Sequence, residues 1–255
     1  MSTPRWSVVI PAYNEAARLP RYLQEIAAYF DGRGEPYEVL VIDDGRDDAT
    51  AELVREIAVS FPALSVHSSP RNHGKGHAVR TGMRSARGAL RLMADADGAT
   101  AIVEVKRLEA AIQAGADVAV GSRALPDPSV AVIARRYRRL AGAFFHLVSR
   151  AAGIADVIDT QCGFKLFRGP VADDLFGGLV TEGFGFDVEL LLLARRRGYR
   201  VTEVPVNWAD QAGSKVRVLT DGPRMLAQVV AARVRLARAD SRRQMPRPTH
   251  PRSRP

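Results

Sequence analysis

Residues Ala89-Leu90-Arg91-Leu92-Met93-Ala94 form a mostly apolar run, and Asp95-Ala96-Asp97 follows it directly. An apolar run of this length predicts a buried β-strand. Two carboxylates then stand at its C-terminal end, where alternate residues point to the same side. Carboxylates bind Mg²⁺ or Mn²⁺ together with substrate phosphates, and open α/β sheets bind ligands at the carboxyl ends of their strands. The stretch therefore predicts a metal-bound diphosphate site, against the alternative of an ordinary acidic turn.

Apolar runs alternate with helical patterns through the first half of the chain. Strands are predicted near 6–11, 37–43, 64–68, 89–94 and 117–121, and helices near 15–30, 48–60, 76–87 and 101–114. The alternation predicts an α/β fold with a single, mostly parallel sheet flanked by helices. No Gly-x-Gly-x-x-Gly follows the first strand, and the run ending His73-Gly74-Lys75-Gly76 lacks the features of a P-loop. Neither a dinucleotide-binding nor a P-loop site is therefore supported.

The composition is that of an ordinary globular protein. Its 255 residues are 46% hydrophobic and 25% charged, which allows one substantial core. Cys162 is the single cysteine, which excludes an internal disulfide and favours a reducing compartment. The N-terminus lacks the pattern of a signal peptide, and no stretch reaches about 18 apolar residues without charge. We therefore expect no transmembrane helix.

The positive charge is concentrated towards the C-terminus. The chain carries +9 overall, and residues 221–255 hold nine arginines and two aspartates, so residues 1–220 carry only +2. We predict a catalytic domain over 1–220, an amphipathic helix over 221–240 and a disordered basic tail over 241–255. Because the body is nearly neutral, nucleic acid is not an expected partner. The tail either contacts an anionic membrane surface or only aids solubility. The first alternative predicts a cytoplasmic protein, peripheral on the inner face of the membrane.

Residues 131–153 form an arginine-rich segment. Its arginines alternate with leucine, phenylalanine and valine, and no acidic residue occurs between Pro128 and Asp156. The pattern predicts an amphipathic helix, which either lies at a membrane interface or packs its apolar side on the core. Residues Met225 to Leu236 are a second candidate for such a helix.

The order of the motifs along the chain carries a resemblance. The motifs of the first half are Ser7-Val8-Val9-Ile10-Pro11-Ala12-Tyr13-Asn14-Glu15, Val39-Leu40-Val41-Ile42-Asp43-Asp44-Gly45, Arg71-Asn72-His73-Gly74-Lys75-Gly76 and Asp95-Ala96-Asp97. In this order they resemble the inverting family 2 glycosyltransferases, which have the GT-A fold. The motifs of the second half are Gln161-Cys162-Gly163-Phe164-Lys165-Leu166-Phe167, Phe186-Asp187-Val188-Glu189-Leu190, Val204-Pro205-Val206-Asn207-Trp208 and Gly213-Ser214-Lys215-Val216. They look like the dolichyl-phosphate β-glucosyltransferase branch, which moves glucose from UDP-glucose to a polyprenyl phosphate.

The resemblance implies a donor site and a Mg²⁺ or Mn²⁺ cofactor. Asp97 would be the main metal ligand, and Asp95 would share the metal or reach the ribose. The residues implied for the nucleoside are Pro11, Ala12, Tyr13, Glu15, Asp43 and Asp44. The alternative for Asp43 and Asp44 is capping of the helix at 48–60, for which Asp47 or Asp48 is better placed. Lys75 would reach a phosphate or the base, or else is a solvated loop lysine.

The acceptor decides which further residues take part. A lipid phosphate is already ionised and needs cations rather than a base. Arg123, which follows the predicted strand 117–121, is the first candidate because arginine binds phosphate bidentately. Lys165 and Lys215 are weaker candidates. A hydroxyl acceptor would instead need a general base, and Asp187 or Glu189 would supply it, unless these acids only complement a helix dipole.

Three alternatives stay open. The donor could be GDP-mannose, the acceptor could be a soluble hydroxyl compound, or the chain could be a catalytically silent, membrane-docked scaffold. Arg46 follows Asp43-Asp44-Gly45 where the family has Ser. This extra cation is expected near the nucleoside site, so it bears on which nucleobase or donor sugar is bound. Cys162 is expected to pack in the core, since inverting transfer needs no covalent intermediate.

Overall fold

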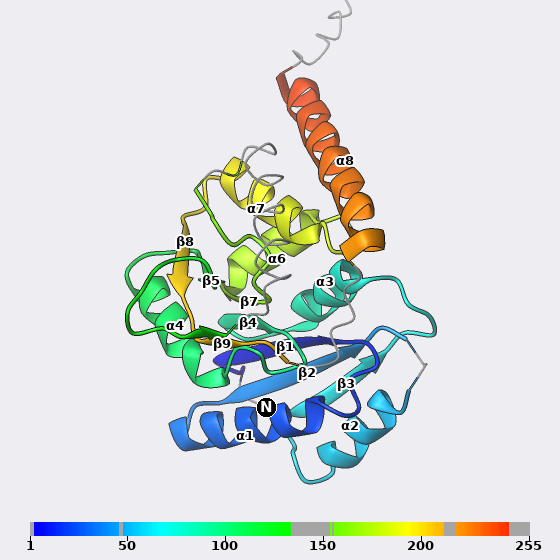
Figure 1. Ribbon diagram of the computed structural model, residues 1–255, viewed down its shortest axis with the longest axis vertical. Helices are drawn as coiled ribbons and strands as arrows, with labels where there is room; N and C mark the ends of the chain where they lie inside the picture. The colour runs from blue at the N-terminus through cyan, green and yellow to red at the C-terminus, as the bar shows by residue number, and fades with distance from the viewer. Residues whose placement is uncertain (1–2, 46–47, 134–153, 155, 212–217, 245–255) are drawn as a thin grey trace, which may run out of the picture.

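A seven-stranded sheet forms the centre of the protein, in the order β3-β2-β1-β4-β7-β5-β8 (Figure 1). The computed structural model describes residues 3–45, 48–133, 154, 156–211 and 218–244, with side chains in the last range described for 222–238. The strands of this sheet are β1 (Trp6–Ala12), β2 (Tyr37–Asp43), β3 (Leu64–Ser68), β4 (Leu90–Ala94), β5 (Val118–Ser122), β7 (Phe164–Arg168) and β8 (Val201–Pro205). Only β7 is antiparallel to its neighbours β4 and β5. The predicted mostly parallel sheet is confirmed.

Helices cover both faces of this sheet, as predicted. They are α1 (Leu19–Arg33), α2 (Thr50–Ala58), α3 (Lys75–Ser85), the 3₁₀ turn η1 (Ile102–Glu104), α4 (Val105–Gln113), α6 (Gly169–Gly178), α7 (Phe186–Arg196) and α8 (Val218–Gln244). Helices α1 and α2 lie below the sheet in Figure 1, and α3, α6 and α7 lie above it. A second, two-strand pairing joins β6 (Val132–Ile133) to β9 (Trp208–Ala209).

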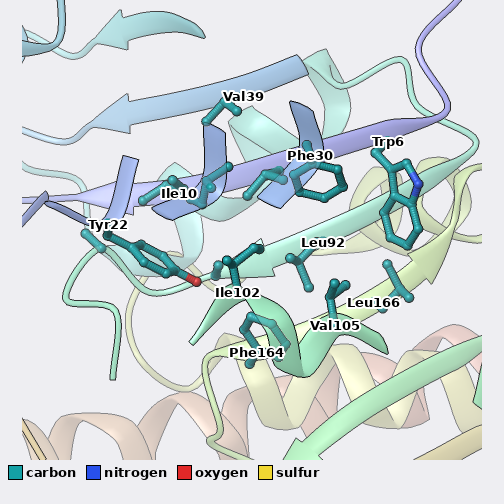
Figure 2. Close-up of a cluster of buried hydrophobic side chains, with 14 of the residues drawn as sticks. Trp6, Ile10, Tyr22, Phe30, Val39, Leu92, Ile102, Val105, Phe164 and Leu166 are labelled. Carbon is teal, nitrogen blue, oxygen red and sulfur yellow. The ribbon is translucent and has the colours of Figure 1, made fainter. Parts of the chain in front are cut away.

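The central strands are mostly apolar because both of their faces are buried. Val8 of β1 belongs to the cluster beneath the sheet, and its neighbour Val9 belongs to the cluster above it. Figure 2 shows the first cluster, in which Trp6 and Phe30 lie close together at one end. Their ring centroids are 5.6 Å apart. Burial of aromatic side chains stabilises a fold by several kcal/mol each, so this layer fixes α1 on the sheet.

Two helices begin later than predicted. Asn14 has φ +56°, a left-handed conformation that interrupts helical geometry, and α1 begins only at Leu19, with Pro20 in its first turn. Helix α2 begins at Thr50 rather than 48, and the Asp48 carboxylate accepts the Thr50 N–H at 2.9 Å. Asp48 therefore satisfies the start of α2, as predicted, which leaves Asp43 and Asp44 for another role.

The second half departs from the prediction at two places. Val132–Ile133 are a strand, so the predicted amphipathic segment 131–153 does not begin as a helix; its residues 134–153 lie outside the described residues. Helix α8 begins before 221 and runs through Gln244. Residues 241–244, predicted to be disordered, are thus helical, and 245–255 are not described. Within the described residues, no helix is both long and apolar enough to cross a membrane.

The strand order determines which loops meet. Strands β1, β2, β4 and β5 run in the same direction, so their carboxyl ends lie at one edge of the sheet. The antiparallel β7 brings its first residue, Phe164, opposite Ala94 at the end of β4. The residues before β7 therefore join the carboxyl edge, where open α/β sheets bind ligands.

Candidate active site

Asp95 and Asp97 are positioned directly after β4. The Asp95 N–H donates to the Gly163 carbonyl at 3.1 Å, which ties the end of β4 to the residue before β7. A Cβ atom on Gly163 would overlap the Asp95 carboxylate, so only glycine leaves room for it. Asp97 accepts the Ala99 N–H at 3.1 Å. The side chains of Asp95 and Asp97 are 38% and 23% exposed, so a ligand can reach them.

Two cations surround this pair of carboxylates. Lys75, the first residue of α3, places its ammonium 2.6 Å from Asp95. The guanidinium of Arg18 lies 3.6 Å from the Asp97 carboxylate. The Nε atom of Arg18 also donates to Oε2 of Glu15 at 2.8 Å, so Glu15 holds Arg18 in place. Glu15 thus acts on Asp97 through Arg18. Lys75 is therefore ion-paired at this edge, and its predicted contact with a phosphate or the base stays a prediction.

The carboxylate pair fits a hard divalent cation. Burial, and then the neighbouring Asp95, raise the pKa of Asp97, because close carboxylates repel each other. A dication relieves that repulsion. Nowhere in the described part of the chain do three His, Cys, Asp or Glu side chains form a complete metal cage. An ion such as Mg²⁺ needs no such cage, since it takes one or two carboxylates and completes its shell with water and phosphates.

Asp43 ends β2, in register with Ala12 at the end of β1. Its side chain is buried, and among the described residues no donor reaches its Oδ1 atom. Burial, and then Asp48 and Glu52, raise the pKa of Asp43 to about 6. A buried acceptor without a donor costs free energy. Asp43 is therefore suited to accept a hydrogen bond from a ligand such as a nucleobase N–H or a ribose hydroxyl.

Asp44 organises the loop that precedes α3. Its carboxylate accepts the His73 N–H at 3.0 Å and the Gly74 N–H at 2.6 Å. Gly74 has φ +112°, and a Cβ there would lie 2.6 Å from the Glu182 carbonyl oxygen. Asp44 therefore positions the loop that carries Lys75, and its carboxylate is engaged by the backbone rather than turned towards a nucleoside.

The ends of β1 and β2 are held together around Tyr13. The Asp44 N–H donates to the Ala12 carbonyl at 2.9 Å. A Cβ on Gly45 would lie 2.8 Å from the Tyr13 ring, so the Asp-Asp-Gly turn needs glycine to pass that ring. Pro11 precedes these residues in β1 and pairs in register with Ile42. Of the six residues predicted for the nucleoside, Pro11, Ala12, Tyr13 and Asp43 thus lie together at this edge. Glu15 pairs with Arg18, and Asp44 binds the loop before α3. The contact of these residues with a nucleoside stays a prediction.

Arg123 follows β5 and is held by Asp159. Its Nε and NH2 atoms donate to the two oxygens of Asp159 at 2.6 and 2.8 Å, and its backbone N–H donates at 3.0 Å. Its guanidinium also lies 5.5 Å from the centre of the Trp208 ring. Although burial alone raises the pKa of Asp159, Arg123 lowers it below the usual range. One edge of the guanidinium is therefore engaged, and a ligand would approach the other.

Lys165 and Asp187 form a buried ion pair. Lys165 is fully buried on β7, and its ammonium donates to the Asp187 carboxylate and, at 2.7 Å, to the Cys162 carbonyl. This geometry does not favour the predicted contact of Lys165 with the acceptor phosphate, because its charge is buried and paired with Asp187. Burial raises the pKa of Asp187, and Lys165 and Lys75 oppose that rise. Lys165 thus supports Asp187 and the turn before β7.

Glu189 holds three elements together. It is fully buried in the first turn of α7, and it accepts the Thr181 N–H at 2.7 Å and the Arg235 guanidinium of α8 at 2.6 Å. These bonds favour a structural role for Glu189 over a role as general base.

Cys162 is buried as well, and burial raises the pKa of its thiol to about 12, which agrees with its predicted place in the core.

Two predicted residues cannot be compared with the structure, and two residues of the site were not predicted. Lys215 and Arg46 lie outside the described residues. Arg18 and Asp159 were not among the predicted site residues, yet they hold Asp97 and Arg123 respectively. A signal for Arg18 is its spacing of three from Glu15, which predicts contact on one side of a turn. Asp159 carries no such local signal, because the strand order alone brings it to Arg123.

The sheet edge and its acidic pair belong to a known class of enzyme. The family model "Glycosyl transferase family 2" matches residues 7–176. The chain therefore belongs to glycosyltransferase family 2 and is a glycosyltransferase.

Within this family, the chain is similar to several curated proteins that share one name. The chain is 40% identical over 223 residues to "Dolichyl-phosphate beta-glucosyltransferase" of Drosophila melanogaster, covering 82% of this chain and 68% of the relative. It is 39% identical over 220 residues to "Dolichyl-phosphate beta-glucosyltransferase ALG5C" of Trichomonas vaginalis, covering 82% and 65%. The human protein of the same name is 36% identical over 227 residues, covering 84% and 70%. The chain thus spans about two thirds of the length of these curated relatives.

Solved structures share the fold. Glucosyl-3-phosphoglycerate synthase from Mycobacterium tuberculosis, determined with Mn²⁺ and uridine-diphosphate-glucose, has a TM-score of 0.63 at 19% identity, covering 90% of this chain and 77% of that one. Mannosyl-3-phosphoglycerate synthase from Rubrobacter xylanophilus has a TM-score of 0.66 at 21% identity, covering 97% and 79%. At these identities the likeness confirms the fold alone.

Proposed function

We propose that this enzyme transfers glucose from UDP-glucose to a polyprenyl phosphate of the dolichyl type, with inversion at the anomeric carbon. The observation that carries the proposal is the acidic pair Asp95 and Asp97 on the same sheet edge as Asp43, whose Oδ1 atom receives no hydrogen bond from the described residues. The names of the curated relatives support both the sugar and the acceptor.

The donor would lie across the ends of β1, β2 and β4. Asp43 would accept a hydrogen bond from the uracil or the ribose, and Tyr13 would lie beside the nucleoside. Asp95 and Asp97 would hold Mg²⁺ or Mn²⁺, and the bound metal would act as a Lewis acid that stabilises charge on the leaving diphosphate. Lys75 would turn from Asp95 to a phosphate oxygen when the metal occupies the carboxylates, since an ammonium stabilises the same charge.

The acceptor phosphate would lie near the end of β5. A phosphate is ionised at neutral pH, so the attacking oxygen needs no general base. Arg123 would bind it through the guanidinium edge that Asp159 leaves available, because arginine and phosphate form strong charge-assisted hydrogen bonds. Lys215 stays a proposed second cation. Asp187 would position the reacting groups; with a hydroxyl acceptor it would instead be the base, and its raised pKa suits that role.

The acceptor is a membrane lipid under this proposal, so the enzyme would act at a membrane surface. We place it on an anionic, cytoplasmic face, because its C-terminal end is strongly basic.

Nucleotide binding tests the donor side. We expect calorimetry with Mn²⁺ to show tighter binding of UDP than of GDP, and Asp43→Asn to weaken UDP binding. As a control, Asp156→Asn changes an exposed carboxylate whose one described contact is a 3.4 Å pair with Arg195, and it should bind UDP like the wild type. A preference for GDP would transfer the assignment to mannosyl transfer.

A further inference from the structure

Helix α8 has two apolar sides, and among the described residues one is buried against the fold while the other is partly exposed. Met225, Val229 and Ala232 are at most 3% exposed. Leu226, Val230 and Val234 are 42%, 54% and 44% exposed. Residues four apart lie on one side of a helix, so the exposed three form a stripe, which we call the outer face. In Figure 1 the helix rises away from the body beyond α7.

The outer face is a continuous, mostly apolar surface along one side of α8. Alanines at 227 and 231 extend the stripe, Pro223 begins it, and Arg235 and Arg238 lie at its far end. Soluble proteins seldom leave contiguous aliphatic surface exposed unless a partner or a membrane covers it. Three half-exposed aliphatic side chains on successive turns therefore indicate a docking surface.

The charges beside the outer face have one sign. Residues 222–239 contain four arginines, Arg224, Arg233, Arg235 and Arg238, and no acidic residue. Arg224 and Arg238 are exposed on the helix surface. An apolar stripe bordered by arginines is complementary to the headgroup region of an anionic bilayer, where aliphatic side chains enter the acyl boundary and arginines meet phosphates.

The opposite side of α8 reaches the active site. The Gly185 N–H, just before α7, donates to Gln228 at 2.9 Å. Gln161, in the turn before β7, lies 3.1 Å from the Met225 sulfur. Arg235 donates to the buried Glu189 in the first turn of α7, two residues after Asp187. A surface that holds α8 therefore also fixes the orientation of the loops at the proposed acceptor end of the site.

We propose that the outer face of α8 docks the enzyme on an anionic lipid bilayer and so orients the active site towards a lipid acceptor; the second part rests on the proposed function. Leu226, Val230 and Val234 enter the interface, and Arg224 and Arg238 bind lipid phosphates. A second copy of the chain fits this surface less well. A two-fold contact would pair the same face with itself, and the arginine rows would meet without acidic partners.

Vesicle binding of the full chain tests the docking. The vesicles are phosphatidylcholine with about one third phosphatidylglycerol, and the readout is co-sedimentation without nucleotide or acceptor. Leu226→Gln, Val230→Gln and Val234→Gln together should weaken binding by about tenfold or more, because apolar area is no longer buried. The control changes two exposed aliphatic residues elsewhere, Val59→Gln and Val103→Gln, which are 88% and 45% exposed. It should bind like the wild type.

A second variant tests the charges, and it does not depend on the first. Arg224→Gln with Arg238→Gln should weaken binding to the anionic vesicles at about 0.1 M salt and have little effect at about 1 M, where charges are screened beyond ~3 Å. Binding of the triple α8 variant equal to that of its control would overturn the docking. So would an unchanged affinity accompanied by loss of a dimer in sedimentation, which would assign the face to a second copy.

The two proposals fail separately. A chain that binds vesicles through α8 but transfers no glucose contradicts the proposed function alone. A chain that glucosylates a short, water-soluble prenyl phosphate but binds no vesicles contradicts the docking alone.

Discussion

Asp43 destabilises the folded protein, and it is a proposed ligand of the donor. Its folded pKa of about 6 exceeds the ordinary value of 3.8. Between these values the folded protein binds a proton that the unfolded chain has released, so the free energy of unfolding falls as pH rises from about 4 to 6. Binding residues often reduce the stability of a fold, because they are selected for contact with a ligand. Asp43 fits this pattern: it destabilises the fold at neutral pH, and no donor among the described residues reaches its Oδ1 atom.

Replacing this carboxyl should separate the two effects. The free energy of unfolding of Asp43→Asn minus that of the wild type should increase by about 1–2 kcal/mol as the pH rises from about 4 to about 7.5. The reason is that the amide has no charge to bury. Urea unfolding at both pH values measures it. A difference between the two proteins that stays constant with pH would contradict the raised pKa.

The acidic pair after β4 should be indispensable. Asp97→Asn should lower glucosyl transfer by about 10²-fold or more, because metal stabilisation of the leaving group contributes several kcal/mol, while the thermal midpoint changes little. Initial rates with and without EDTA measure it, and Asp156→Asn is the control. Full activity in Asp97→Asn, or in the wild type with EDTA, would remove the metal from the account.

The acceptor residues make opposite predictions for the two acceptor classes. Arg123→Lys keeps a charge beside Asp159 but loses the planar fork, so it should raise KM for a prenyl phosphate by about tenfold. Asp187→Asn, which keeps an oxygen for Lys165, should have a modest effect. A hydroxyl acceptor reverses the order, since loss of a base costs ~10²–10⁴-fold in rate. Initial rates of both variants decide between them.

One buried ion pair, Lys165 with Asp187, joins β7 to α7. Lys165→Met leaves the Asp187 carboxylate enclosed without its cation and should lower the free energy of unfolding by about 3–5 kcal/mol. The double change Lys165→Met with Asp187→Leu should cost less, because no charge then stays buried. Urea unfolding of both proteins measures this, and a single variant as stable as the wild type would show that the pair contributes nothing.

Elements and site residues differed in how far the sequence could predict them. The five strands of the first half and their helices follow from local apolar periodicity, and Asp95 and Asp97 follow from their place at a strand end. The role of Asp43 is implied only by the family resemblance. Lys165 shows where this reasoning stops. Its motif suggests a cation for a ligand, but the antiparallel insertion of β7 buries it against Asp187. Partners more than twenty residues apart, such as Arg123 and Asp159, depend on strand order, which no local pattern encodes.

The asymmetric charge of the whole chain should affect membrane binding in addition to α8. Deleting residues 245–255, which follow the end of α8, should weaken binding to anionic liposomes at low salt, and the loss should shrink at about 1 M salt. Co-sedimentation measures it, with neutral liposomes as the control. Unaltered binding to anionic liposomes would leave the tail with only a solubilising role.

An assay of the transfer reaction tests most directly whether the enzyme glucosylates a polyprenyl phosphate. The enzyme is incubated with UDP-glucose, Mn²⁺ and either a short polyprenyl phosphate or the matching polyprenol, and the lipid product and UDP are quantified. We expect UDP and a β-linked glucosyl phosphate lipid in equal amounts from the phosphate alone, and neither from Asp97→Asn. Glucose transfer to the polyprenol, or no lipid product from the wild type while UDP-glucose binds, would contradict the account.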